Sequence, residues 1–76
     1  MEWRERIHSD AKILSGKPVV KGTRLSVEFL LRLFAAGWSE AQVLEGYPHL
    51  EDEDLRAIFA YAAEVAAEER GFALRR

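Results

Sequence analysis

Hydrophobic residues recur at helical spacing in the centre of the chain. From Val27 onward the apolar side chains fall three and four residues apart, Ser26 precedes them as an N-cap, and Gly37 ends the run. This pattern predicts a first helix over residues 27–36. If Gly37 takes the left-handed conformation that ends many helices, the Trp38 ring can pack back on the helix.

Two further helices are predicted after the turn at Gly37. Ser39 and Gln42, three residues later, have the spacing of a capping box, which predicts a second helix over residues 40–45. The Gly-Tyr-Pro sequence that follows removes helix propensity and a backbone donor, so this helix is short. A third helix is predicted over residues 52–70, with Glu51 as its N-cap.

The apolar stripes of these helices predict the hydrophobic core. One tryptophan is expected to fix the corner between the first two helices, because it can contact both. The predicted core residues are Leu30, Phe34, Trp38, Val43, Leu55, Ile58 and Phe59.

The first 25 residues have a different pattern, in which apolar residues such as Val19 and Val20 are separated by Ser, Asp, Gly and Pro. This pattern indicates short strands that form a β-hairpin arm. A lone two-stranded hairpin is marginally stable, so the arm should pair with a second chain or lie on the helices. The predicted fold is mainly α: one domain over residues 1–76, with the arm at 1–25, a three-helix, helix-turn-helix-like core at 26–71 and a tail at 72–76.

Length and composition narrow the possible functions. A chain of 76 residues is near the lower size at which one core sustains a fold, so we expect a homodimer. The absence of cysteine excludes disulfides and thiol chemistry and is typical of a cytoplasmic protein. The charged N-terminus resembles no secretory signal, and no apolar run approaches the length of a membrane span.

Charge is unevenly distributed along the chain. Residues 1–35 carry seven Lys or Arg and four acids, for a net charge of +3, whereas residues 36–76 carry four Arg and nine acids, for −5. The N-terminal half is therefore expected to present a basic face to an anionic partner.

No residue group in the sequence has the spacing of an enzymatic or cofactor site. The Gly-rich loop over residues 16–23 is not a phosphate-binding loop, because Gly22 is followed by Thr23 and Arg24 rather than by Lys and then Ser or Thr. The acids at residues 51–54 suit the first turn of a helix better than a metal site. Neither histidine has a ligand or nucleophile at suitable spacing, so we expect no enzyme activity, no metal and no cofactor.

A corner followed by a third helix is typical of helix-turn-helix proteins, in which the last helix enters the major groove by its N-terminal residues. Here that end carries four acids, which phosphates would repel. If DNA is bound, the basic N-terminal segment and Arg32 are the expected contacts.

Four segments resemble domain-of-unknown-function family 433: SGKPVVKGTRLSV at residues 15–27, AGWS at 36–39, YPHL at 47–50 and AYA at 60–62. The resemblance extends over residues 7–63. It departs from the family pattern at Ser26, where proline is frequent, and at Glu51, where a threonine cap is frequent. The resemblance implies a homeodomain-like three-helix domain that is similar to VapB-type antitoxins, commonly encoded beside a PIN-like ribonuclease toxin.

The expected function is therefore an antitoxin-like binding module of a type II toxin–antitoxin system that neutralises a PIN-like ribonuclease, with autoregulation through DNA as an addition. The alternative is a helix-turn-helix regulator without a toxin partner. Arg24 is also expected to form an ion pair with Asp10, Asp52 or Asp54. The expected partner-binding residues are Lys17, Lys21, Arg24, Arg32, Phe72 and Leu74.

Overall fold

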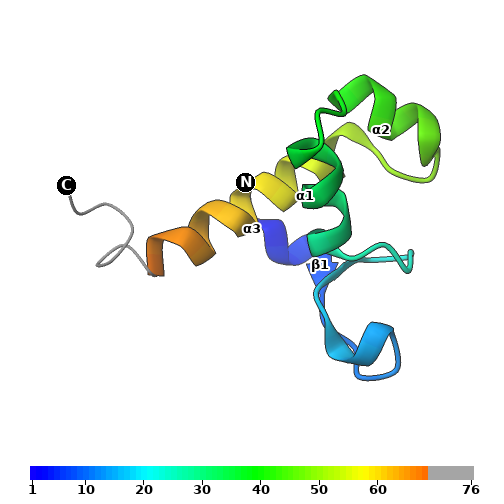
Figure 1. Ribbon diagram of the computed structural model, residues 1–76. Helices are drawn as coiled ribbons and strands as arrows, with labels where there is room; N and C mark the ends of the chain where they lie inside the picture. The colour runs from blue at the N-terminus through cyan, green and yellow to red at the C-terminus, as the bar shows by residue number, and fades with distance from the viewer. Residues whose placement is uncertain (69–76) are drawn as a thin grey trace.

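The chain folds into three α-helices preceded by a small β-hairpin, as Figure 1 shows for a computed structural model in which residues 1–68 are described. The mainly helical fold and the N-terminal hairpin that were predicted are confirmed. No helix within residues 1–68 has the length and hydrophobicity needed to cross a bilayer. The elements in chain order are η1 (Trp3–Glu5), β1 (Ile7–His8), η2 (Leu14–Gly16), β2 (Val19–Val20), α1 (Val27–Ala35), α2 (Glu40–Gly46) and α3 (Asp52–Glu68).

Helix α1 begins and ends at the predicted signals. The Ser26 hydroxyl accepts a hydrogen bond from a backbone N–H of the first turn. At the other end the Gly37 N–H donates to the Phe34 carbonyl at 3.0 Å, and the Trp38 N–H donates to the Leu33 carbonyl at 3.1 Å. With Gly37 at φ +102°, these two bonds form a Schellman motif and turn the chain toward α2.

Helix α2 is held by the predicted capping box. The Ser39 hydroxyl accepts from the Gln42 N–H at 3.1 Å, and the Gln42 side chain accepts from the Ser39 N–H at 2.8 Å. The Trp38 ring lies against Gly46 at the end of this helix. The turn between α1 and α2 therefore has the predicted backbone conformation, and the partly exposed Trp38 ring packs on the end of α2.

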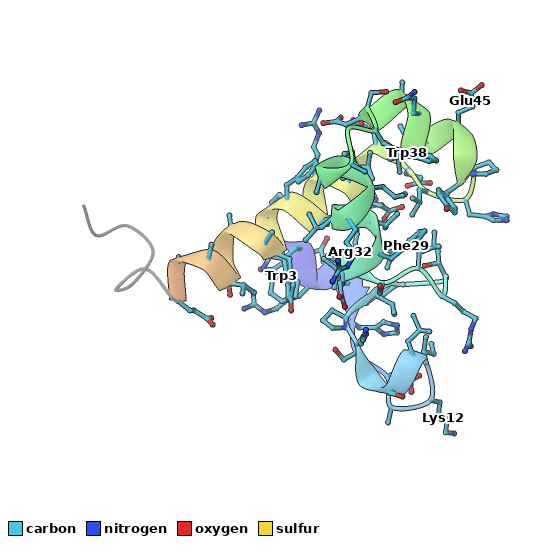
Figure 2. All side chains as sticks on the ribbon, in the orientation of Figure 1. Trp3, Lys12, Phe29, Arg32, Trp38 and Glu45 are labelled. Carbon is cyan, nitrogen blue, oxygen red and sulfur yellow. The ribbon has the colours of Figure 1, made fainter. Side chains whose placement is uncertain are left out.

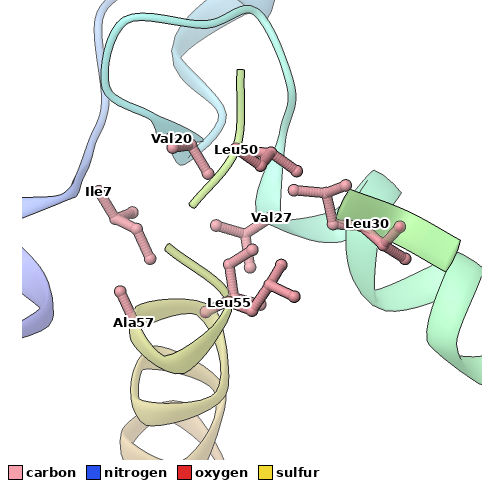
Figure 3. Close-up of a cluster of buried hydrophobic side chains, with 9 residues drawn as sticks. Ile7, Val20, Val27, Leu30, Leu50, Leu55 and Ala57 are labelled. Atoms are coloured by element: carbon pink, nitrogen blue, oxygen red, sulfur yellow. The ribbon is translucent and has the colours of Figure 1, made fainter. Parts of the chain in front are cut away.

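The core is formed by aliphatic side chains from the hairpin and all three helices (Figure 3). Leu30, Val43, Leu55 and Ile58 are buried, as predicted. The aromatic residues predicted with them are not: Trp38 is 40% exposed and Phe59 38% exposed, and Phe34 is half-buried with its ring 5.0 Å from that of Phe59. The prediction that Trp38 and Phe59 are buried was wrong, because strand residues fill the interior, whereas Phe34 packs against the edge of the core. The buried cluster consists of Ile7, Val20, Val27, Leu30, Val43, Leu50, Leu55, Ala57 and Ile58.

The hairpin lies on the helices of its own chain. Ile7 pairs with Val20 and His8 with Val19 in antiparallel register, and Val19 also bridges to Ser26 at the start of α1. Ile7, Val19 and Val20 are buried. The arm was predicted either to pair with a second chain or to lie on the helices, and the structure has the second arrangement.

The N-terminal segment crosses α3 and contacts it through a tryptophan. The Trp3 ring lies edge-on to Tyr61 at 4.8 Å, and its indole N–H donates to Glu64 at 3.0 Å. Arg4 lies over the Trp3 ring and forms an ion pair with Glu64 at 3.1 Å. Figure 2 shows Trp3 beside α3, so residues far apart in sequence close one side of the domain.

Arg6 joins the hairpin to the first turn of α3. Its guanidinium contacts the carboxylates of Asp54 at 2.9 Å, Glu53 at 2.8 Å and Glu51 at 3.2 Å. The hydrogen bond to Asp54 is the main cause that raises the pKa of Arg6. Asp54 is only 7% exposed, and its second oxygen accepts from the Glu51 N–H at 2.8 Å. Glu51 thus precedes the helix as predicted, but Asp54 supplies the capping carboxylate.

The predicted ion pair of Arg24 is wrong. Arg24 is exposed and pairs with no carboxylate of residues 1–68, which include Asp10, Asp52 and Asp54. Asp54 is instead occupied by Arg6, which reaches it from a segment that precedes the Gly-rich loop.

Truncation of a core leucine should destabilise the domain strongly. Leu55→Ala removes a fully buried side chain, and we expect the free energy of unfolding to fall by about 3 kcal/mol. Leu14→Ala is the matched control, because Leu14 is exposed, and should cost less than about 1 kcal/mol. Urea denaturation followed by circular dichroism measures both values, and equal losses would contradict this core.

Removal of the Asp54 carboxylate should loosen the start of α3. Asp54→Ala deletes the acceptor of the Glu51 N–H and the most buried partner of Arg6, so we expect a loss of about 1 to 2 kcal/mol in unfolding free energy. Asp52→Ala, at an exposed position of the same turn, should change it by less than about 0.5 kcal/mol. The same denaturation measurement applies, and a neutral Asp54→Ala variant would refute the role of this carboxylate.

Candidate binding surface

Three adjoining hollows lie along helix α1 and the turn that precedes it. The first, of about 440 Å³, lies between α1 and α3; the central one, of about 560 Å³, lies between α1 and η2; the third, of about 390 Å³, lies between residues 22–25 and 46–49. Lys17 lines both the first and the central hollow, and Arg24 and Leu25 line both the central and the third. The three hollows therefore form one continuous surface, which we call the α1 surface.

The first hollow has an apolar floor and a charged rim. Its floor includes Val27, Leu31 and Ala35, which lie four residues apart on α1, and Tyr61 of α3. Its charged rim consists of Lys17, Glu28 and Arg32.

Glu28 neutralises part of the positive charge on this rim. Its two oxygens accept from Lys17 at 3.0 Å and from Arg32 at 2.9 Å. The hydrogen bond from Lys17, followed by that from Arg32, holds the pKa of Glu28 below its usual value. Two of the predicted partner-binding cations are thus engaged within the chain.

The central hollow is flanked by two exposed apolar side chains, Leu14 and Phe29. The Phe29 ring also packs edge-on against Tyr47, with 5.9 Å between centroids. Leu14 and Ser15 have positive φ angles of 51° and 59°, a conformation that is costly for residues other than glycine. The chain therefore presents Leu14 on the surface at a conformational cost.

The third hollow has two walls, and each is a turn with defined hydrogen bonds. In the first wall the Thr23 hydroxyl donates to the Val20 carbonyl at 2.8 Å and accepts from the Leu25 N–H at 3.0 Å. In the second wall the Tyr47 carbonyl accepts from the Leu50 N–H at 2.9 Å. Both walls are fixed by the fold before any ligand arrives.

The predicted site residues are only partly brought together. Lys17, Arg24 and Arg32 all line the α1 surface. Lys21 is exposed on the same turn as Arg24, and its backbone N–H donates to the Arg6 carbonyl at 2.8 Å. The remaining two predicted residues, Phe72 and Leu74, lie outside the described residues.

Sequence reasoning missed the apolar and aromatic members of this surface. Phe29 falls off the apolar stripe of its helix, and an aromatic residue in such a position is a signal of an exposed contact. Tyr61 and His49 carried no comparable signal, because their roles depend on the elements packed beside them.

Comparisons with known proteins agree with this fold. Residues 7–62 match the family model described as "Protein of unknown function (DUF433)". Over 59 residues the chain is 42% identical to an uncharacterised protein, y4eO, of Sinorhizobium fredii; the match covers 78% of this chain and 27% of that protein, so the chain spans about a quarter of this relative. A crystal structure of a DUF433 member from Anabaena variabilis superposes with a TM-score of 0.77 and 26% identity, over 90% of this chain and 68% of that one.

Loss of the Lys17 ammonium should raise the pKa of Glu28 toward its usual value, because the hydrogen bond from Lys17 is the largest cause of the lowering. We expect Lys17→Gln to show this change in a carboxyl ¹³C NMR titration, with Arg32 retaining part of the effect. Lys12→Gln, which removes an equal charge from an exposed position outside the rim, is the control.

The pH dependence of these ion pairs follows from the direction of the shift. A lowered folded-state pKa means that the stabilisation is present above the pKa of an unfolded glutamate and is lost as pH falls through the folded value. An unchanged titration of Glu28 in Lys17→Gln would show that the 3.0 Å contact has no electrostatic effect in solution.

Proposed function

The chain belongs to the DUF433 family, and we propose that it is an antitoxin-like binding module that neutralises a PIN-like ribonuclease in a type II toxin–antitoxin system. The proposal concerns the α1 surface. Exposed apolar groups occur there together with Arg24, which pairs with no carboxylate of residues 1–68, and this composition suits a protein partner with acidic groups.

The observation that carries the proposal is the state of Arg24. It lies where the central and third hollows meet, next to exposed Phe29, and pairs with no carboxylate of residues 1–68. A partner that supplied a carboxylate here would gain a charge-assisted hydrogen bond while its neighbouring apolar groups covered Phe29 and Leu14. The combination supports protein binding more strongly than either feature alone.

A PIN-like ribonuclease fits this chemistry because its cleft is lined by acidic metal ligands. Arg24 and Lys21 extend from one turn and would face such a cleft together. Lys17 and Arg32 would contribute less, because Glu28 already pairs with both of them. The proposal therefore places the electrostatic centre of the interface at the turn that carries Arg24.

A DNA-binding regulator is the alternative function. The end of α3 that would enter a major groove carries Asp52, Glu53 and Asp54, and Arg6 is engaged by two of these acids. Phosphates would meet like charge at this end. These contacts favour a protein partner over a nucleic acid.

A homodimer is part of the same proposal. Phe59 is exposed on α3, and the exposed Ala63 and Ala66, four and seven residues later on the same face, would allow another helix to approach closely. A second copy would cover this face and leave the α1 surface accessible to the ribonuclease.

Charge reversal on the Arg24 turn should separate the two functions. We expect the double variant Lys21→Glu, Arg24→Glu to inhibit the PIN-like ribonuclease encoded by the adjacent gene at least about tenfold less tightly, because each cation would become a repulsive charge. Phe29→Ala should weaken inhibition through the apolar part of the surface. Ribonuclease assays with titrated protein measure both effects, and Lys12→Glu is the control at an exposed position outside the three hollows.

DNA binding is measured on the same variants with the promoter region of the operon. A double variant that inhibits the ribonuclease normally but no longer binds DNA would favour the function of a DNA-binding regulator. Wild-type protein that leaves the ribonuclease fully active would contradict the antitoxin proposal.

A further inference from the structure

We propose that the third hollow, between residues 22–25 and 46–49, is a binding site for a single carboxylate group, with Arg24 as its charged donor. The inference deepens the proposed function and rests on it only for the source of the carboxylate, an acidic side chain of the partner protein. The hollow itself is defined by residues of this chain.

Arg24 differs from the other arginines of the described chain. Residues 1–68 contain five arginines, and Arg4, Arg6, Arg32 and Arg56 each form an ion pair with a carboxylate of the same chain. Arg24 forms none within these residues, although the chain is rich in acids. The guanidinium is therefore available to an external anion.

The hollow offers this anion no competing charge from its described lining. The residues of both walls include Arg24, His49 and Tyr47 and no Asp or Glu. The imidazole and the phenol can form hydrogen bonds, and the guanidinium supplies a planar pair of donors that matches the two oxygens of a carboxylate. The site therefore has positive charge and hydrogen-bonding groups at one opening.

The walls are also held in place independently of a ligand. The Thr23 hydroxyl bridges the Val20 carbonyl and the Leu25 N–H, so the turn that carries Arg24 is closed by two side-chain hydrogen bonds. Gly22, at φ +81°, leaves open space where a side chain would lie. A fixed turn lowers the ordering cost of binding, which is required if a single charged contact is to be effective.

A single carboxylate suits this site better than a phosphate chain. Glu45 immediately precedes the second wall, and Glu51, Asp52 and Glu53 follow it closely. A nucleic acid carries a negative charge at every nucleotide, so the phosphates next to one bound at Arg24 would be repelled by these acids. One carboxylate at the end of a side chain can reach Arg24 without that repulsion.

The test uses two peptide probes that differ in one charge. ¹⁵N-labelled protein is titrated with acetyl-Ala-Asp-Ala-amide and, as the neutral match, with acetyl-Ala-Asn-Ala-amide. We expect saturable amide shifts at residues 22–25 and at Tyr47 and His49 with the Asp peptide alone. Because Arg24 is exposed, Arg24→Gln should keep the dispersed spectrum of the folded protein and weaken these shifts at least about tenfold.

Two further variants define the geometry. Arg24→Lys keeps the charge but loses the paired donors, so it should bind between wild type and Arg24→Gln. Lys12→Gln removes a cation that Figure 2 places at the far end of the N-terminal loop, and it should leave the shifts unchanged.

The outcomes separate this inference from the antitoxin proposal because the probe contains no ribonuclease. Equal shifts with the Asn peptide, shifts that persist in Arg24→Gln, or no shifts at all would overturn the carboxylate site. Tighter binding of inorganic phosphate than of the Asp peptide would overturn it in favour of a phosphate ligand. Saturable Asp-specific shifts in a protein that fails to inhibit the ribonuclease would support the site while refuting the proposed partner.

Discussion

Arg6 connects the N-terminal arm of the domain to the start of helix α3. Its side chain contacts the carboxylates at the start of α3, and its backbone carbonyl accepts from the Lys21 N–H, next to the turn that carries Arg24. One residue of the hairpin thus connects the first turn of the last helix with the Gly-rich loop. Asp54 completes the connection, because its second oxygen accepts from the Glu51 N–H and so fixes the helix start in the same place.

This connection decides how the surface charges are distributed. The acids that begin α3 are neutralised in part by Arg6, and Glu28 neutralises part of the positive charge of Lys17 and Arg32. Lys21 and Arg24 are exposed on one turn and remain accessible to an external partner. The chain is acidic as a whole, yet Arg24, the one arginine of residues 1–68 without an ion pair, lies on the α1 surface.

The small interior explains why aromatic residues lie at the edge of the domain. Ile7, Val19 and Val20 enter the core from the hairpin and leave no room for rings. Trp38 and Phe59 therefore cover the ends and sides of helices, and Phe29 packs on Tyr47 beside the third hollow. The same packing that stabilises the fold thus leaves apolar area on the surface that is proposed to bind a partner.

The sequence by itself determined the local structure. The cap at Ser26, the turn at Gly37 and the capping box at Ser39 each depend on hydrogen bonds between residues within five positions of one another, so spacing alone predicts them. Family membership followed from the same local motifs.

Only the tertiary structure decided which distant charges meet. Arg6 reaches Asp54 across 48 positions, and the third hollow joins residues 22–25 to 46–49, because chain closure and competition for the interior depend on all the elements together. Arg24 is therefore recognisable from the sequence as a cation of the loop, but its lack of an ion pair within residues 1–68 depends on the tertiary structure, in which Arg6 and Arg56 take Asp54 and Asp52, two of its three predicted partners.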